Sequence, residues 1–278
     1  MCRRALAIIL LLALATIASG CDGQSASVHG VVAGMVTDQV TGRPIEDVWA
    51  AARTAWAWTN VSGRYWLSLP QGTQSVVFRR VGYAQKDVSV TVPGGTAAQA
   101  DVEMRPILPA GPVAVELTWS AWPKDLDAHL WTTGGFRVSY SYGGSLTSPP
   151  WARLDYDFFD GNGKETITIT NFAPHAYYYS VYNYSARPSL AGCGAQVKVY
   201  SQSQLLYTFD VPHVGPIGCL VWDVFVVDGA SREITKVNVL TNHVAAVPGQ
   251  INSKPQPTDA GFRPVGETTE DEHPNNPD

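Results

Sequence analysis

The residues whose types and spacing could do chemistry are acidic side chains in two short stretches. In the first, Asp125 and Asp127 alternate with apolar residues and are followed by His129. In the second, Asp155 and Asp157 alternate with leucine, tyrosine and phenylalanine. Because alternate side chains of a β-strand share a face, each stretch predicts a polar row opposite a row that enters a core.

If the two strands lie side by side, their four carboxylates form one patch, and repulsion between like charges means that it either faces open water or holds a cation. Ca²⁺ binds about six to eight oxygens, several of them from carboxylates, whereas histidine suits Zn²⁺ or another transition metal better. We name Ca²⁺ as the hypothesis, with a solvated strand face as the alternative. The candidate metal-binding residues are Asp125, Asp127, His129, Asp155, Asp157 and Glu165.

Motifs for catalysis are absent from the sequence. It contains no Gly-x-Ser-x-Gly, no His-Glu-x-x-His and no Cys-x-x-Cys. Paired carboxylates could hydrolyse a glycoside, but these lack an evident apolar setting that would keep one of them protonated. No catalytic residue is therefore assigned, and a metal-dependent envelope hydrolase that uses the Asp/His patch remains the alternative function.

The elements that would position these residues are short strands. Segments of five to eight residues rich in Val, Thr, Tyr and Trp are bounded by Gly and Pro, and no helical periodicity follows residue 20. We expect an all-β protein with two antiparallel sandwiches, at 28–105 and a larger, jelly-roll-like one at 113–243. Residues 106–112 form a stiff linker and 244–278 a disordered acidic tail.

Composition limits the class of partner. The chain has a net charge of −5 and 15% charged residues, which argues against nucleic acid, because nucleic-acid binding needs a basic surface. Hydrophobic residues make up 45%, which is enough for packed cores.

An ordered set of motifs covers the first predicted sandwich. These are Gly34-x-Val36-x-Asp38-x-x-Thr41-Gly42-x-Pro44-Ile45, Thr59-x-x-Ser62-Gly63-Arg64-Tyr65, Leu69-Pro70-x-Gly72 and Gly82-Tyr83. They resemble the carboxypeptidase regulatory-like domain, a transthyretin-like sandwich. The resemblance implies an accessory role as a spacer, a stabiliser or a binding module, with a passive spacer favoured over a specific ligand site.

A second set of motifs spans most of the larger predicted sandwich. These are Leu117-Thr118-Trp119, Asp125-Leu126-Asp127-x-His129-Leu130, Leu154-Asp155-x-Asp157, Gly163-x-Glu165-x-Ile167-Thr168-Ile169 and Trp222-x-Val224-Phe225-x-x-Asp228-Gly229. They resemble the YfaP family of bacterial envelope domains of unknown function. The resemblance implies a β fold and an envelope location rather than a mechanism.

The amino terminus is typical of an exported protein. Arg3 and Arg4 precede an apolar run at 5–18, which ends in Ala-Ser-Gly before Cys21. This resembles the lipobox of bacterial lipoproteins, and an ordinary signal peptide is the alternative. We expect a signal peptide at 1–20, lipidation of Cys21, a tether at 21–27, and a chain anchored to a membrane of the bacterial envelope, facing the periplasm or the exterior.

Cysteines and aromatic residues complete the predictions. Cys193 and Cys219 form an even pair in an oxidising compartment, which predicts a disulfide, with zinc binding together with His213 as the alternative. The second domain is also dense in Trp and Tyr, and exposed rings there could stack on a polysaccharide or anchor a protein. By alternation, Tyr177, Tyr179 and Val181 share one face and Tyr178, Tyr182 and Tyr184 share the other. We expect one of these sets to lie in the core and the other to be partly exposed. The favoured function is non-catalytic binding or scaffolding at the envelope.

Overall fold

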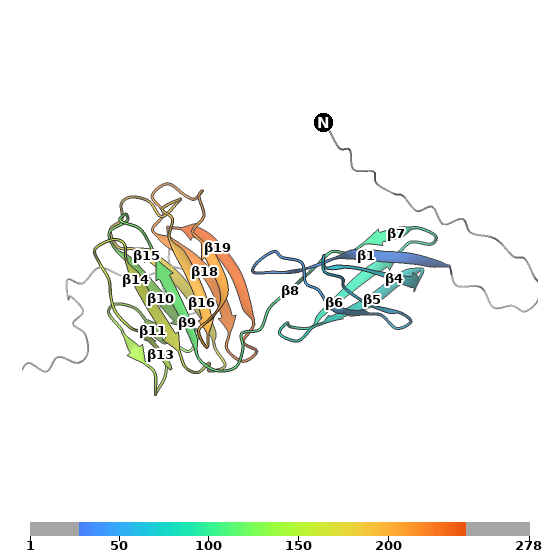
Figure 1. Cartoon of the computed structure of the whole chain (residues 1–278), viewed down its shortest axis with the longest axis horizontal. Helices are drawn as coiled ribbons and strands as arrows, with labels where there is room; N and C mark the ends of the chain where they lie inside the picture. The colour runs from blue at the N-terminus through green and yellow to red at the C-terminus, as the bar shows by residue number, and fades with distance from the viewer. Residues whose placement is uncertain (1–27, 243–278) are drawn as a thin grey trace, which may run out of the picture.

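The computed structural model describes residues 28–242, and this part of the chain is entirely β (Figure 1). It contains nineteen strands and no helix, which confirms the predicted fold class. Accordingly, no helix within 28–242 has the length and hydropathy needed to cross a membrane. The predicted signal peptide, Cys21, the tether and the tail from 244 lie outside the described residues.

The first domain is a small sandwich of two sheets. One has the order β4-β1-β7, with β8 also paired to β1, and the other has the order β3-β2-β5-β6. In β4, Tyr65, Leu67 and Leu69 are buried and the residues between them are exposed, so simple alternation builds this core. The strands are β1 (His29–Asp38), β2 (Trp49–Ala51), β3 (Trp56–Trp58), β4 (Arg64–Pro70), β5 (Gly72–Arg79), β6 (Lys86–Val92), β7 (Ala97–Gln99) and β8 (Val102–Met104).

The second domain is a larger sandwich with one core between its two sheets. The sheets have the orders β11-β10-β15-β18-β19 and β12-β13-β14-β9-β16-β17. Apolar residues such as Leu117, Leu130 and Trp222 from both sheets belong to a single buried cluster. The strands are β9 (Val113–Thr118), β10 (Leu126–Thr132), β11 (Arg137–Val138), β12 (Gly144–Ser145), β13 (Ala152–Leu154), β14 (Lys164–Ile169), β15 (Ala176–Asn183), β16 (Gln196–Ser201), β17 (Gln204–Asp210), β18 (Val221–Asp228) and β19 (Ile234–Thr241).

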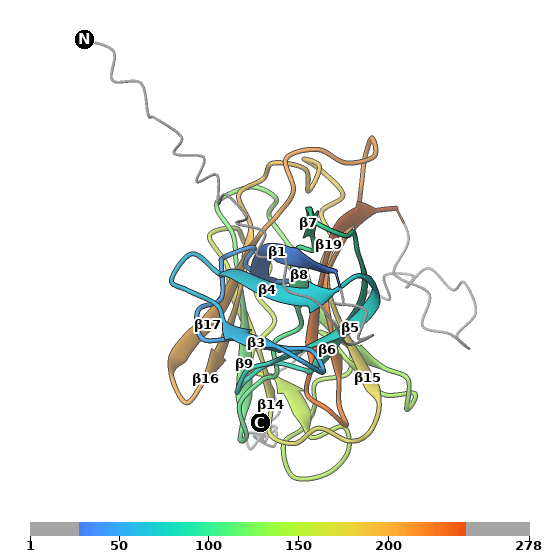
Figure 2. The same cartoon turned by 90° about the vertical axis from the view of Figure 1, so that its right-hand side faces the viewer.

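The junction between the domains is packed and hydrogen-bonded, and Figure 2 shows the first domain in front of the second along the long axis. Val40, in the turn after β1, is buried within the core cluster of the second domain. Leu108 of the linker belongs to the same cluster and donates its N–H to the Arg232 carbonyl at 2.9 Å. The Arg232 side chain in turn donates to the carbonyls of Leu108 (3.2 Å), Pro109 and Gly111 (3.0 Å). The linker is therefore held against the turn between β18 and β19.

Candidate functional site

Strand β10 places Asp127 and His129 on the sheet face opposite the core, as alternation predicts. Both are nevertheless buried, with exposed fractions of 3% and 1%. The segment that begins at β11 covers them, because Arg137 donates a hydrogen bond to His129 Nδ1 at 3.2 Å and the ring of Tyr140 lies 6.3 Å from the imidazole. The alternative of a solvated strand face therefore does not hold at Asp127 and His129.

His129 is held in its neutral form. Burial, together with the positive charge of Arg137, lowers the pKa of His129 to about 3. Because Nδ1 accepts from Arg137, the ring proton resides on Nε2, which is buried without a hydrogen-bond partner. His129 thus lies on the same strand face as Asp127, but its Nδ1 lone pair is engaged by Arg137.

Three of the predicted carboxylates converge. Ligand oxygens of Asp127, Asp157 and Glu165 all lie within 4.8 Å of one another, and we call these residues the acidic cluster. Glu165 reaches it from β14 and is fully buried. Its Oε2 accepts the N–H of Ala128 at 2.7 Å and its Oε1 accepts the N–H of Phe158 at 3.1 Å. Glu165 therefore connects the two sheets through backbone donors.

Asp155 does not join this cluster, and the prediction that it shares a face with Asp157 is wrong. A strand was expected to run from Leu154 through the second acidic stretch, but β13 ends at Leu154. Asp155 then turns its carboxylate to backbone groups, and its Oδ1 accepts the N–H of Thr166 at 2.9 Å and of Tyr156 at 2.8 Å. Alternation cannot place the side chains once the chain has left the sheet.

Burial makes these carboxyl groups resist ionisation. Desolvation raises the pKa of Asp127 well above its usual value, and the charges of Asp125 and Asp157 raise it further. The pKa of Glu165 is also raised well above normal by burial, and then by Asp127. Asp125, immediately before β10, has its pKa raised to about 6 by burial and by Asp157. The pKa of Asp157 is raised by burial, although a side-chain hydrogen bond with Glu165 opposes the shift.

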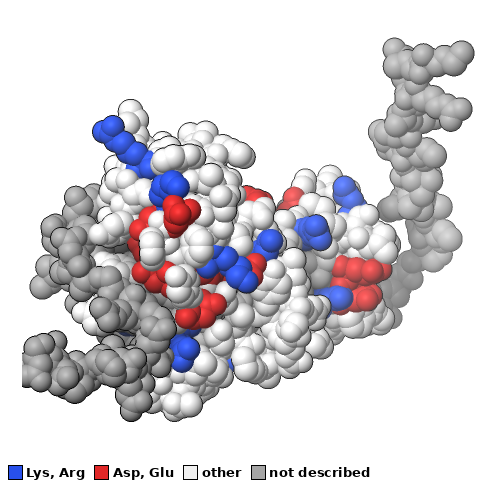
Figure 3. All heavy atoms as spheres, turned by 60° about the vertical axis from the view of Figure 1, so that its left-hand side comes forward, with Lys and Arg blue, Asp and Glu red and all other residues white. Residues whose placement is uncertain are grey.

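Several polar atoms around the cluster lack partners within the described structure. Oδ2 of Asp127, Oδ1 of Asp125 and the hydroxyl of Tyr179 are buried and accept or donate no hydrogen bond. The buried cluster contains acidic groups alone, whereas Figure 3 shows acidic and basic groups interspersed over one exposed face. The acidic cluster can bind protons or a cation. It is poorly placed for hydrolysis, because Asp127 and Glu165 are inaccessible to a polymer.

A second candidate site, which the sequence reasoning missed, lies on the first domain. Trp49 of β2 pairs with Trp58 of β3 and with Arg79 of β5, so the three side chains form a row across one sheet face. Trp56 and Trp58 are 65% and 56% exposed. We call Trp49, Trp56, Trp58 and Arg79 the tryptophan face. The alternation Trp56-Ala57-Trp58 was the signal, because it places both indoles on one side of a strand.

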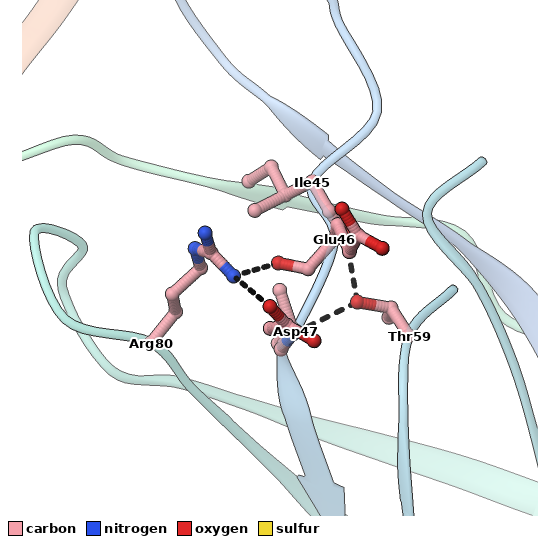
Figure 4. Close-up of polar contacts among 6 residues, drawn as sticks. Ile45, Glu46, Asp47, Thr59 and Arg80 are labelled. Carbon is pink, nitrogen blue, oxygen red and sulfur yellow. Dashed lines mark hydrogen bonds and ion pairs between the residues drawn. The ribbon is translucent and has the colours of Figure 1, made fainter. Parts of the chain in front are cut away.

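A pocket of about 720 Å³ adjoins the tryptophan face, a volume typical of small-molecule sites. Figure 4 shows how its wall is held: Arg80 donates to the Glu46 carbonyl and forms an ion pair with Asp47 at 3.8 Å. Thr59 Oγ1 donates to the Ile45 carbonyl at 2.7 Å, which fixes the same segment from the other side. The pocket is lined by Asp47, Trp49, Trp58, Arg79, Arg80, Val81, Tyr83 and Gln85.

The aromatic residues of the second domain divide as predicted. Tyr177 and Tyr179 are buried, whereas Tyr178 and Tyr182 are half-buried and Tyr184 is 37% exposed. Most of the tryptophans proposed for binding are inaccessible or half-buried, and Trp122 is the well-exposed one, at 57%. Other exposed aromatic residues of the second domain, such as Tyr142, Tyr156 and Phe159, lie in loops outside its strands. Trp56 and Trp58 of the first domain, in contrast, lie on one face of the same strand.

Cys193 and Cys219 are free thiols in the structure, where a disulfide was expected. They lie near each other, since Cys219 is among the groups that raise the pKa of Cys193, after burial itself. Cys219 is buried and its sulfur lies 3.2 Å from Ser189 Oγ. The bridge remains a prediction for an oxidising environment.

Comparison with known proteins identifies the first domain. Residues 31–105 match the family model of the carboxypeptidase regulatory-like domain. No curated protein matches the chain. The resemblance of 113–243 to the YfaP family stays a prediction.

Solved structures give distant similarities only. A candidate carbohydrate-binding protein from Bacteroides uniformis is 11% identical, with 75% of this chain and 99% of that one covered and a TM-score of 0.24. A DUF3823 family protein from Bacteroides ovatus is 11% identical, with 67% and 100% covered and a TM-score of 0.24. A chain of a type II cohesin–X-dockerin complex from Acetivibrio cellulolyticus is 14% identical, with a TM-score of 0.25; 28% of this chain is covered, and the match spans 58% of that chain. At these TM-scores the similarities carry no functional argument.

Proposed function

We propose that this protein is a lipid-anchored protein of the bacterial envelope that binds polysaccharide, without catalysis, through the tryptophan face of its first domain. The observation that supports this most is the exposure of Trp56 and Trp58, at 65% and 56%, on one face of strand β3. Large exposed aromatic side chains are unfavourable in water, and contiguous ones mark interaction surfaces.

The chemistry of the face suits sugar rings. An indole offers a flat apolar surface for the C–H face of a pyranose, and its rigidity keeps the entropic cost of binding low. Hydrogen-bonding groups lie beside the indoles, where Arg79 Nε donates to Gln85 Oε1 at 2.8 Å and Gln85 Nε2 donates to Asp87 Oδ1 at 2.9 Å. Such a polar border can bond the equatorial hydroxyls of a ring stacked on the indoles.

The membrane anchor is the part of the proposal that rests on sequence alone. Lipidation of Cys21 would place the first domain next to the membrane through the short tether at 21–27. Cys21→Ala should move the protein from the membrane fraction to the soluble fraction of fractionated cells. Retention of the variant in the membrane fraction would contradict the anchor.

The geometry does not favour the alternative function, a metal-dependent hydrolase that uses the Asp/His patch. A metal-dependent hydrolase needs carboxylates or a metal that substrate can reach, and Asp127 and Glu165 are 3% and 0% exposed. The binding proposal therefore stands without a reaction.

Affinity electrophoresis of the full-length protein in gels that contain soluble glucan, mannan or xylan tests the proposal, together with co-sedimentation with peptidoglycan and cellulose. At least one polysaccharide should retard the wild type. Trp56→Ala and Trp58→Ala should each weaken binding by about tenfold, because a nucleic-acid base stacked on an aromatic side chain contributes about 1–3 kcal/mol and we expect a sugar ring on an indole to contribute at the lower end of that range.

Trp66→Ala is the matched control, because Trp66 is 66% exposed but lies on β4 in the other sheet. This variant should bind like the wild type. Absence of binding to every polysaccharide, or equal loss in the Trp66 and Trp58 variants, would contradict the proposal. A crosslinked protein partner that is lost with Trp58→Ala would assign the face to a protein instead.

A further inference from the structure

We propose that Asp127, Asp157 and Glu165, with Asp125 beside them, bind one divalent cation of the Ca²⁺ type. Ligand oxygens of the three clustered residues lie within 4.8 Å of one another. Oxygens that bind one Ca²⁺ lie about 2.3–2.6 Å from it, so two oxygens on opposite sides of the ion are separated by about twice that distance. The observed separations therefore suit a single shared ion.

The fold brings these oxygens together from three segments. Strand β11 pairs only with Leu130 and Trp131 of β10, so the beginning of β10 has an open edge. Glu165 crosses from the other sheet and accepts the Ala128 N–H at that edge. Each of its carboxylate oxygens accepts one N–H and keeps a second lone pair, because such an oxygen has two. The backbone hydrogen bonds orient Glu165, and a cation would replace its side-chain hydrogen bond with Asp157.

A second observation points to a missing partner. Asp127 is 3% exposed, and its Oδ2 has no hydrogen-bond partner within the described structure. Oδ1 of Asp125 is also buried and unpartnered. A buried carboxylate oxygen left unpaired is costly. The cationic side chain that acts on Asp127 is Arg137, whose guanidinium donates to His129. A cation held by the acidic cluster would give Asp127 Oδ2 a partner and offset the negative charge that Asp125 adds beside it.

The ligand chemistry selects the kind of ion. The clustered donors are all carboxylate oxygens, which favour hard cations such as Ca²⁺. His129, the donor that would favour Zn²⁺, is not among the clustered residues. Asp125 and Asp157 are only partly buried and give an ion a route to the two buried carboxylates. Protons compete with the cation for these carboxylates, because burial raises the pKa of Asp127 and Glu165.

Titration of the EDTA-treated full-length protein with CaCl₂ at neutral pH, followed by calorimetry and thermal melting, tests the proposal. Ca²⁺ should bind once per chain and raise the melting temperature. Asp157→Asn should weaken binding by about tenfold or more, since ligand charge sets Ca²⁺ affinity. Asp155→Asn is the matched control, because Asp155 is two residues away but directs its carboxylate to the Thr166 and Tyr156 backbone.

Terbium luminescence gives a readout that does not depend on a stability difference between variants. Tb³⁺ replaces Ca²⁺ in oxygen sites and is sensitised by nearby tyrosine, and Tyr179 lies close enough to Glu165 for its pKa to be raised by that charge after burial. Wild type and Asp155→Asn should sensitise Tb³⁺, and added Ca²⁺ should quench the signal. Absence of Ca²⁺ and Tb³⁺ binding by the wild type at millimolar concentration would overturn the proposal, and so would equal binding by Asp157→Asn and Asp155→Asn. So would binding of Zn²⁺ alone that is lost with His129→Asn.

Discussion

Glu165→Ala should destabilise the second domain strongly, because this side chain accepts hydrogen bonds from two backbone N–H groups in the protein interior. The N–H groups belong to Ala128 and Phe158, at 2.7 and 3.1 Å. Each buried donor left unsatisfied costs about 1–3 kcal/mol. The substitution also removes the desolvation penalty of the buried carboxyl group, which offsets part of this loss in stability. We expect a loss of about 2–4 kcal/mol in the free energy of unfolding, a large share of the roughly 5–15 kcal/mol of a typical domain.

Urea unfolding in the presence of EDTA measures this loss without any contribution from a cation. The second-domain transition is the relevant one, because two domains need not unfold together. Glu116→Ala is the control: Glu116 lies on β9, the neighbour of β14, and forms an ion pair with Lys164 at 3.7 Å near the surface. This variant should change stability by less than about 1 kcal/mol. Equal stabilities for Glu165→Ala and the control would refute the assignment of Glu165 as the acceptor that connects the sheets.

Three further predictions concern pH, the linker and the thiols. The pKa of Asp125 is raised from 3.8 to about 6, so between these pH values the folded state holds a proton that the unfolded chain releases. Without a cation, the free energy of unfolding should therefore decrease as the pH rises from about 4 to 6, by about 1–2 kcal/mol after allowance for partial exposure. Asp125→Asn should flatten this part of the pH profile of unfolding. Arg232→Ala should remove the hydrogen bonds to three linker carbonyls and make 106–112 the first site of cleavage in limited proteolysis, whereas unchanged cleavage would show that the linker is held by other contacts. Oxidation of the purified protein should join Cys193 and Cys219, seen as loss of alkylation by mass spectrometry, and raise the stability by about 3 kcal/mol; persistent free thiols would exclude the bridge.

Much of the fold was predictable because alternation is a local property of the chain. The buried residues of β4 and β9 follow it closely, and so do the two sets of tyrosines in β15. Residues 31–105 also carried motifs whose family assignment was confirmed.

The candidate site was predictable only in part, because its geometry depends on where strands end and which strands are neighbours. Asp127, Asp157 and Glu165 were named from the sequence and do converge. Asp155 was misplaced because the strand ends one residue before it. The cover over His129 was missed because Arg137 and Tyr140 belong to a segment whose only strand, β11, is two residues long. None of these features has a periodic signal.

The second domain does not complete its core alone, because Val40, from the turn after β1 of the first domain, is buried within its cluster. A second domain that begins at residue 106 would keep its linker contacts but would expose the part of its core cluster against which Val40 packs. Exchange of the first domain for a homologue would therefore succeed only if the replacement carried an aliphatic residue at the tip of the same turn. Recombination that exchanges either domain alone would break the contact between Val40 and the core of the second domain. We therefore expect the two domains to be inherited together.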